Sequence, residues 1–399
     1  MSGLTELFIF ELLLFLVAAG IGRLISKKTK QPIVLGEILM GMLLANIGLL
    51  IGMPDLIQVS DAMSQVADLG ILLLLFSAGL ELDFNELKSV GKSSFIVAML
   101  GVIVPFGFGF LVARFFGFPN TVSLFMGLCL VATSVGITAE ILREMDLLRT
   151  KMGSLIIGAS VIDDVVGIVF MGIILSVIAS GSFSILEIMP IVIAVIAFFF
   201  LSLTIGVNFF KEISKTFWMK KENLVMFGLI IALAFAVTSE SIGLTAITGS
   251  FLAGLVLGQS QFSKDLLNPM YLLGEAFFVP IFFLTTGMLF KLGALGSFSL
   301  LLLAIGIIIA GILSKIIGAG AGARLFGFTK RESLFTGVAM VPRAEVALVL
   351  VKVGIDHQFI DSSFASVILL LVVFTTFFPL IILPKLGKKL KGNPLEGRK

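Results

Sequence analysis

Long apolar runs recur along the whole chain, and they constrain its fold more than any other feature. Hydrophobic residues make up 58% of the sequence and charged residues 13%, whereas a soluble domain carries about 25% charged residues. An apolar run of about 20 residues crosses a bilayer as a helix, because its backbone must satisfy its own hydrogen bonds there. We therefore predict an all-α polytopic membrane protein with 13 transmembrane helices, near residues 7–25, 32–51, 63–81, 93–114, 122–142, 151–179, 187–210, 223–239, 245–259, 271–290, 297–323, 332–352 and 363–384.

The basic residues predict the orientation of these helices. When the loops alternate sides, 23 of the 28 lysines and arginines fall on one side, and only Arg114, Lys291 and Lys352 fall on the other. Loops rich in positive charge stay in the cytoplasm, so we expect the N-terminus outside and the C-terminus in the cytoplasm. The net charge of +3 is then a topology signal that needs no nucleic-acid partner. A cleaved signal peptide has a basic segment before its apolar run, and the first apolar run of this chain has none. We therefore interpret this run as a retained helix.

Two residue types exclude several classes of chemistry. Cys129 is the single cysteine, so no disulfide forms within the chain, and His357 is the single histidine. A metal site built from histidines or a Ser-His catalytic pair is therefore not expected. We predict no enzymatic activity and no cofactor, with membrane lipids as the surroundings of the chain.

An internal repeat is the second organising feature. The stretches "ARFFGF" at 113–118 and "ARLFGF" at 323–328 differ in position by 210 residues. Nearly the same offset relates 34–44 to 247–257, 75–82 to 283–290, and 127–139 to 337–349. We predict a first six-helix repeat over 1–180, a connector helix over 181–222, a second repeat over 223–386 and a short basic cytoplasmic tail over 387–399. A single connecting helix inverts the second repeat, and inverted repeats are typical of secondary transporters.

Two adjacent carboxylates, Asp163 and Asp164, lie inside the apolar run "GASVIDDVVGIVF". At about 1.5 Å per residue they lie roughly 18–20 Å from the cytoplasmic end of their helix, near the middle of the bilayer. Ionisable groups at such depth are rare and usually line an ion or proton path. We predict that both acids bind protons and a small metal cation.

Other polar residues are expected at the same depth. Lys315 is a candidate counter-charge for one of the two acids, although a lysine can also extend toward the membrane surface. Thr133 and Ser134 are candidate ion-binding residues, although hydroxyl groups in membrane helices often bond their own backbone. Arg343 and Glu345 are interpreted as a pair that neutralises a broken helix. The glycine after the hydroxyls and Pro342 favour helices that unwind at mid-membrane and expose carbonyl groups to an ion.

These residue types favour exchange of a cation for protons. Carboxylate oxygens bind small cations and also bind protons. When proton and metal compete for the same oxygens, binding of one releases the other. An intramembrane aspartyl protease would need its two acids on separate helices, and here they are adjacent on one helix. A passive channel would conduct without obligatory proton exchange.

The chain resembles the cation:proton antiporter-2 family of bacteria and archaea. The segments that carry the resemblance are "PIVLGEILMGMLL", "LLLFSAGLELD", "ATSVGITAEIL", "GASVIDDVVG", "PIFFLTTGM" and "VPRAEVAL", in family order. The resemblance implies two inverted six-helix repeats, crossed discontinuous helices, a core domain and a dimerisation domain. It also implies a homodimer in a prokaryotic cell membrane, with a role in pH homeostasis.

The resemblance implies roles for single residues as well. Asp164 would be the main cation ligand and proton carrier, and Asp163 would form a salt bridge with Lys315 that breaks when a cation enters. Paired acids with this lysine imply electrogenic Na⁺ or Li⁺ exchange for H⁺ by an elevator-like movement of the core. A K⁺/H⁺ antiporter, or the transmembrane part of a potassium efflux system, stays open as the alternative. Relatives under glutathione control carry a long nucleotide-binding domain, and this sequence has no Rossmann-type glycine motif.

Overall fold

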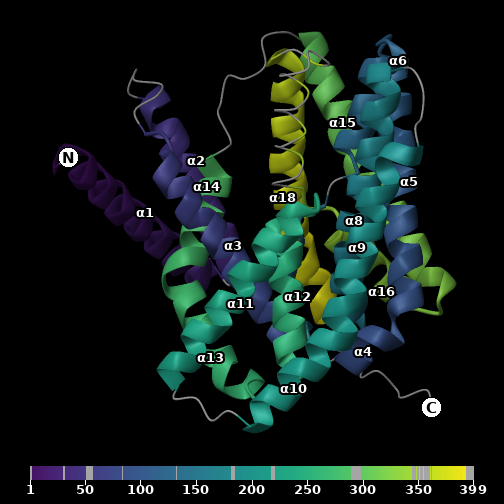
Figure 1. Cartoon of the computed structure of the whole chain (residues 1–399). Helices are drawn as coiled ribbons and strands as arrows, with labels where there is room; N and C mark the ends of the chain where they lie inside the picture. Colours follow the sequence, from purple (N-terminus) through teal and green to yellow (C-terminus); the bar gives the residue numbers. More distant parts are fainter. Residues whose placement is uncertain are drawn as a thin grey trace. The chain divides into compact units, whose positions relative to one another are not determined.

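The computed structural model describes residues 2–29, 32–50, 57–82, 84–131, 133–180, 185–216, 221–288, 298–343, 347, 350, 354, 360 and 362–391 (Figure 1). Within these ranges the chain forms helices joined by short connections, and none of these residues lies in a strand. Nine of the described helices are long and apolar enough to cross a membrane, and three shorter apolar helices cover Ile33–Gly48, Asn120–Cys129 and Ala246–Gly258. The chain is therefore an all-helical, multi-pass membrane protein, while the count of 13 crossings stays a prediction.

The helices belong to two compact units, each built from two separate parts of the chain. Unit 1 covers Met1–Ser89 and Ser182–Leu292 and contains the helices α1 (Ser2–Thr29), α2 (Ile33–Leu50), α3 (Asp61–Glu81), α4 (Phe84–Ser89), α9 (Ile185–Leu201), η1 (Ser202–Gly206), α10 (Val207–Thr216), α11 (Lys221–Ser241), α12 (Ala246–Gly258), α13 (Ser263–Leu273), η2 (Gly274–Phe278) and α14 (Val279–Met288). Unit 2 covers Val90–Gly181 and Gly293–Lys399 and contains α5 (Gly91–Phe115), α6 (Asn120–Cys129), α7 (Val135–Glu144), α8 (Lys151–Ser180), α15 (Phe298–Leu325), α16 (Lys330–Ala339) and α18 (Ser362–Lys391).

Every predicted span contains helical residues, with differences in detail. The span 122–142 is interrupted between Cys129, where α6 ends, and Val135, where α7 begins. The short helix α4 was not expected, because its six residues are too few to cross a membrane. Five-residue π-helical turns, η1 and η2, interrupt the predicted spans 187–210 and 271–290. Much of the predicted span 332–352 after residue 343 lies outside the described residues. Each unit draws helices from both predicted repeats, so the units and the repeats divide the chain differently.

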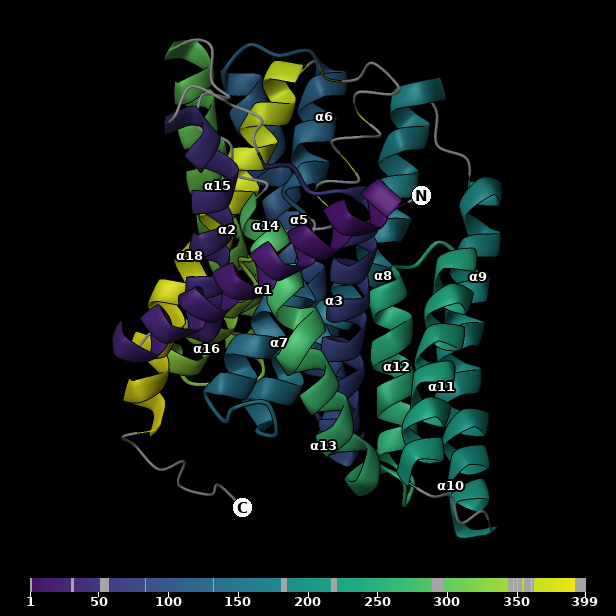
Figure 2. The same cartoon turned by 90° about the vertical axis from the view of Figure 1, so that its left-hand side faces the viewer.

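Close helix crossings in unit 1 depend on glycine. Helices α2 and α14 cross at Gly41 and Gly287, where a Cβ would lie 2.0 and 2.1 Å from a carbonyl oxygen of the opposite helix. Helices α3 and α12 cross in the same way at Gly79 and Gly254, at 2.2 and 2.1 Å. Small residues at such crossings let membrane helices approach closely. In Figure 2 α1 lies across α2 and α14, with which it is in contact.

These two crossings support the predicted repeat. The sequence match of 34–44 with 247–257 relates α2 to α12, and the match of 75–82 with 283–290 relates α3 to α14. If each helix of the first repeat is replaced by its counterpart in the second, and the reverse, the α2–α14 crossing becomes the α12–α3 crossing. A two-fold relation between the repeats requires this. The inverted repeat as a whole stays a prediction.

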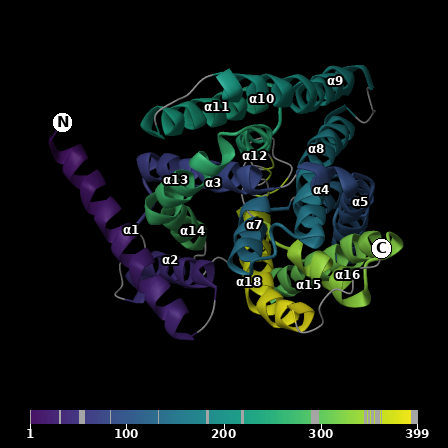
Figure 3. The same ribbon diagram turned by 90° about the horizontal axis from the view of Figure 1, so that it is seen from below.

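In unit 2, α5 and α15 lie side by side (Figure 3). Their C-terminal ends have the same structure. Gly117 and Gly327 follow the two helices with φ of +85° and +82°, a left-handed conformation that glycine adopts without strain. Arg114 Nη1 donates to the Phe118 carbonyl at 2.6 Å, and Arg324 Nη1 donates to the Phe328 carbonyl at 2.7 Å. The repeated "ARxFGF" sequence thus forms one kind of helix end twice.

Unit 2 also contains two helix interruptions. Helix α6 ends at Cys129 and α7 begins at Val135, while α16 ends at Ala339 and the chain leaves the helical conformation over residues 340–343. A buried apolar cluster that includes Phe125 of α6, Ile307 of α15 and Leu371 of α18 extends to Leu130 at the start of the first interruption. The interruptions lie where the sequence predicted unwinding. Their backbone carbonyl groups, which have no partner within a helix, line the site described next.

Candidate cation-binding site

Asp163 and Lys315 form a fully buried ion pair in unit 2. Asp163 lies on α8 and Lys315 on α15, and their side chains are 2% and 0% exposed. The Lys315 ammonium donates to Asp163 Oδ2 at 3.1 Å and to Oδ1 at 3.2 Å. A charge buried alone is very unfavourable, so each member stabilises the charged form of the other.

The ammonium also donates to two backbone carbonyl groups. Its distances are 2.6 Å to the Gly101 oxygen on α5 and 3.3 Å to the Val131 oxygen, which follows the end of α6. The Lys315 nitrogen is therefore surrounded by four oxygen atoms from three segments of unit 2. Oxygen atoms in this arrangement could equally hold a metal cation.

Thr133 and Ser134 lie in the interruption between α6 and α7, and both side chains are buried. The Thr133 hydroxyl donates to the Val131 carbonyl at 3.3 Å and lies near the Asp163 carboxylate. The Ser134 N–H donates to the Pro342 carbonyl at 2.8 Å, so the two interruptions of unit 2 are directly joined. The structure thus places Thr133 beside the acid and Ser134 at the junction of the interrupted segments.

Asp164 differs from its neighbour in exposure. Asp163 is buried, whereas Asp164 on the same helix is half-buried. Adjacent residues on a helix point about 100° apart, which gives two neighbouring acids different surroundings. Asp164 interacts electrostatically with Lys315. One acid is thus held by the ammonium, and the more exposed one is suited to receive an ion or a proton from water.

Arg343 is a second fully buried cation in unit 2, at 0% exposure. Its Nη2 donates to the Leu130 carbonyl at 2.6 Å and to the Gly311 carbonyl at 3.3 Å, and its Nη1 donates to the Val341 carbonyl at 3.0 Å. Its Nε has no hydrogen-bond partner among the described residues. The guanidinium therefore joins the ends of both interrupted helices to α15. Glu345, its predicted partner, lies outside the described residues.

Several participating groups were not expected from the sequence. The carbonyl groups of Gly101, Val131 and Leu130 hold the two buried cations, and backbone groups leave little trace in a sequence. One signal was present, because Gly101 precedes Pro105 by four residues, a spacing that deprives a helix carbonyl of its usual donor.

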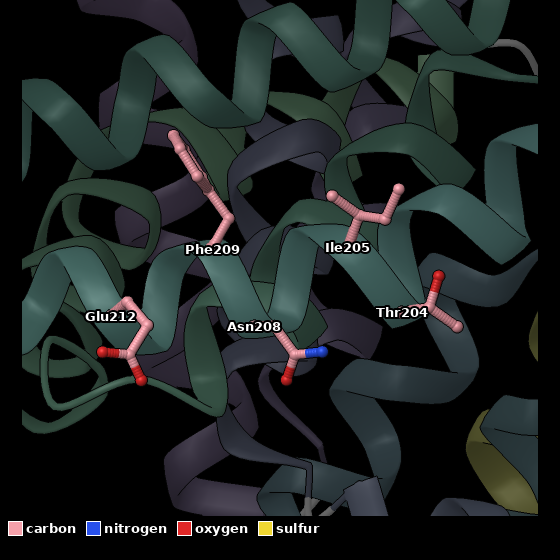
Figure 4. A pocket seen from close by; sticks show the side chains of 5 residues that line it. All are labelled: Thr204, Ile205, Asn208, Phe209 and Glu212. Atoms are coloured by element: carbon pink, nitrogen blue, oxygen red, sulfur yellow. The ribbon is translucent and has the colours of Figure 1, made fainter.

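Unit 1 contains buried and partly buried polar pairs of its own. Arg23 forms a salt bridge with the buried Glu37, and Tyr271 donates to Glu81. A surface pocket is lined by side chains of η1 and α10 (Figure 4): Thr204, Ile205, Asn208, Phe209 and Glu212. None of the residues predicted to bind the ion lines that pocket.

Known proteins resemble this chain over almost its whole length. Residues 12–387 match the family model described as "Sodium/hydrogen exchanger, transmembrane". A relative named Na(+)/H(+) antiporter from Enterococcus hirae is 32% identical over 390 residues, covering 97% of this chain and 100% of the relative. The Na(+)/H(+)-K(+) antiporter GerN from Bacillus cereus is 30% identical over 375 residues, covering 92% and 93%. The structure of the sodium proton antiporter MjNhaP1 from Methanocaldococcus jannaschii matches with a TM-score of 0.69 and 18% identity, covering 98% of this chain and 100% of that one.

Proposed function

We propose, on the premise that this chain belongs to the sodium/hydrogen exchanger family, that it exchanges Na⁺ or Li⁺ for H⁺ across a membrane. The observation that carries the proposal is the Lys315 ammonium seated on the Asp163 carboxylate and two backbone carbonyls. An ammonium is a monovalent cation attached to the protein. A transported cation that enters must displace it from the same oxygen atoms.

The exchange follows from the charges of the cluster. In the cation-free state, the protonated Lys315 neutralises Asp163, and Asp164 takes up one proton from water. An entering cation binds Asp164 and Asp163, with the Thr133 hydroxyl and the Ser134 region completing the site. Because a carboxylate cannot hold a proton and a metal ion on the same oxygen, cation binding releases protons. Once the ammonium leaves Asp163, Lys315 loses its proton as well. Two protons then leave for each monovalent cation that enters, so the transport moves net charge and is electrogenic.

Arg343 has a different role in this scheme. A guanidinium stays protonated at any physiological pH, so it supplies constant positive charge where Lys315 supplies charge that can move or be lost. With Glu345 it would neutralise the interrupted helices while the ion site fills and empties.

The larger architecture is also part of the proposal. The described hydrogen bonds of Lys315 and Arg343 all join groups of unit 2, which supports a core that carries the ion as a body in an elevator-like movement. We propose 13 transmembrane helices in two inverted repeats, over 1–180 and 223–386, with the N-terminus outside and the C-terminus in the cytoplasm. The active form would be a homodimer in a prokaryotic cell membrane, contributing to pH homeostasis.

Potassium is the second candidate ion. The GerN relative is named a Na(+)/H(+)-K(+) antiporter. In addition, an ammonium group is similar in size to K⁺, and the four oxygen atoms already hold one at 2.6–3.3 Å. A site of this kind could take K⁺ without first contracting.

The test is proton flux in proteoliposomes under clamped voltage, with Na⁺, Li⁺ and K⁺ compared side by side. We expect proton movement with Na⁺ and Li⁺, and none in D164N, which removes the half-buried acid but keeps its shape. The control Asp61→Asn changes an acid at the start of α3 in unit 1 and should exchange normally. Sodium-dependent proton movement in D164N at the wild-type rate would contradict the proposal, and exchange with K⁺ alone would establish the alternative.

A further inference from the structure

Pro105 changes the hydrogen bonding of α5 at one position. In an α-helix, the N–H of each residue bonds the carbonyl four residues earlier, and proline has no N–H. Pro105 lies inside α5, so the Gly101 carbonyl lacks its regular donor. Lys315 donates to that carbonyl at 2.6 Å, the shortest of the four distances around its nitrogen.

Helix α15 provides an internal comparison. Gly311 stands 210 residues after Gly101 and faces the other buried cation, Arg343. The residue four positions after Gly311 is Lys315, whose backbone N–H can bond the Gly311 carbonyl as in a regular helix. Arg343 reaches the Gly311 carbonyl only at 3.3 Å. The buried cation is therefore closer to the carbonyl whose residue at i+4 is a proline, and farther from the one whose residue at i+4 has an N–H. Proline therefore makes the α5 carbonyl a stronger acceptor than a regular helix carbonyl.

Gly101 itself brings this carbonyl close to the acid. A Cβ at position 101 would lie 3.4 Å from Lys315 Nζ and 3.9 Å from Asp163 Oδ1. Position 101 is therefore in direct contact with the ion pair, and any side chain there would occupy the space beside the ammonium.

We propose that the Gly101 carbonyl, exposed by Pro105, is a ligand of the transported cation once Lys315 has moved away. A full-strength carbonyl and a carboxylate offer the hard oxygen ligands that an alkali cation requires. The inference deepens the proposed function and rests on it: the same oxygen first holds the ammonium and then the ion.

The test uses P105A, which gives α5 an N–H that claims the Gly101 carbonyl. With Lys315 present, P105A weakens the binding of the ammonium and the binding of the cation to the same Gly101 oxygen. Because the two compete, the effects on cation affinity partly cancel. The decisive comparison is therefore made in a K315Q background, where no ammonium competes. There we expect P105A to weaken ²²Na⁺ binding by about three- to tenfold, the worth of one hydrogen-bonding oxygen.

Two further variants keep the test decisive. P105S adds a hydroxyl that can also bond the carbonyl of residue 101, so it should weaken binding at least as much, and it replaces P105A if that variant fails to fold. The control P384A removes a proline from inside α18, four residues after Leu380, on a helix that supplies none of the four oxygen atoms around the Lys315 nitrogen. It should leave ²²Na⁺ binding unchanged. Elution profile and thermal unfolding verify that each variant is folded.

The outcomes are separate for the inference and for the function on which it rests. Equal ²²Na⁺ affinity of the K315Q protein with and without P105A would overturn the inference, while the proposed function would stand. A loss of affinity in the wild-type background alone would show that Pro105 acts only through Lys315, which also overturns it. If the wild-type protein binds no Na⁺, Li⁺ or K⁺ in competition with protons, the proposed function fails, and the inference fails with it.

Discussion

Replacing Arg343 with methionine should destabilise unit 2 strongly, because the guanidinium holds three backbone carbonyls that belong to different segments. Methionine fills a similar volume, so the loss is mainly polar. Hydrogen bonds from a charged group contribute about 1.5–3 kcal/mol in water-soluble proteins, and those within membranes average about 0.6 and reach about 1.7 kcal/mol. Two bonds are short and one is long, and together they predict a loss of about 2–4 kcal/mol.

The assay is reversible unfolding of the purified protein in mixed micelles with increasing denaturant. R324M is the matched control, because Arg324 donates to a single carbonyl and is exposed; its loss should stay below about 1 kcal/mol. R343K should fall between the two, since an ammonium has no planar fork to span the carbonyls. If R343M lost no more free energy of unfolding than R324M, the joining role assigned to Arg343 would be wrong.

Two further predictions concern packing and charge in unit 2. G311A should lower the free energy of unfolding by about 1–3 kcal/mol, because the added Cβ meets a leucine side chain of α18 at 2.8 Å. G107A should raise it by up to about 1 kcal/mol, because a Cβ there has nothing within 4 Å. Equal unfolding midpoints for the two variants would contradict the packing described. D163N should lose about 3–5 kcal/mol because it leaves the Lys315 ammonium buried without its partner, and the double variant D163N/K315Q should recover most of that loss. If the double variant were as unstable as D163N, the instability of D163N would not come from the unpaired Lys315 ammonium.

Much of this arrangement was predictable because it depends on composition and spacing. The apolar runs predicted the helices, and the adjacent acids with Lys315 indicated where charge is buried. Pro342 and the glycine after Ser134 indicated the two interruptions. Other parts have no comparable signal. The division into two units depends on packing between helices far apart in the sequence, and the carbonyl acceptors of Lys315 and Arg343 belong to residues whose side chains are apolar or absent.

The π-helical turns were also outside the reach of the sequence. Neither η1 nor η2 contains a proline that would mark it, although Pro269 and Pro280 flank η2. An extra residue in a helical turn rotates the following side chains by about 100°. In a span that is apolar on most sides, this rotation leaves no readable signature in the hydrophobic pattern.

Competition between protons and a cation for the same oxygen atoms is measured most directly by proton release on Na⁺ binding. Purified protein in weakly buffered solution receives NaCl, and a pH electrode counts the protons while ²²Na⁺ binding is followed from pH 6 to 9. Binding should release protons, and the dissociation constant should fall as pH rises, by up to about tenfold per pH unit for each proton displaced. D163N/D164N should release none. Sodium binding of constant affinity over this range, without proton release, would contradict the account.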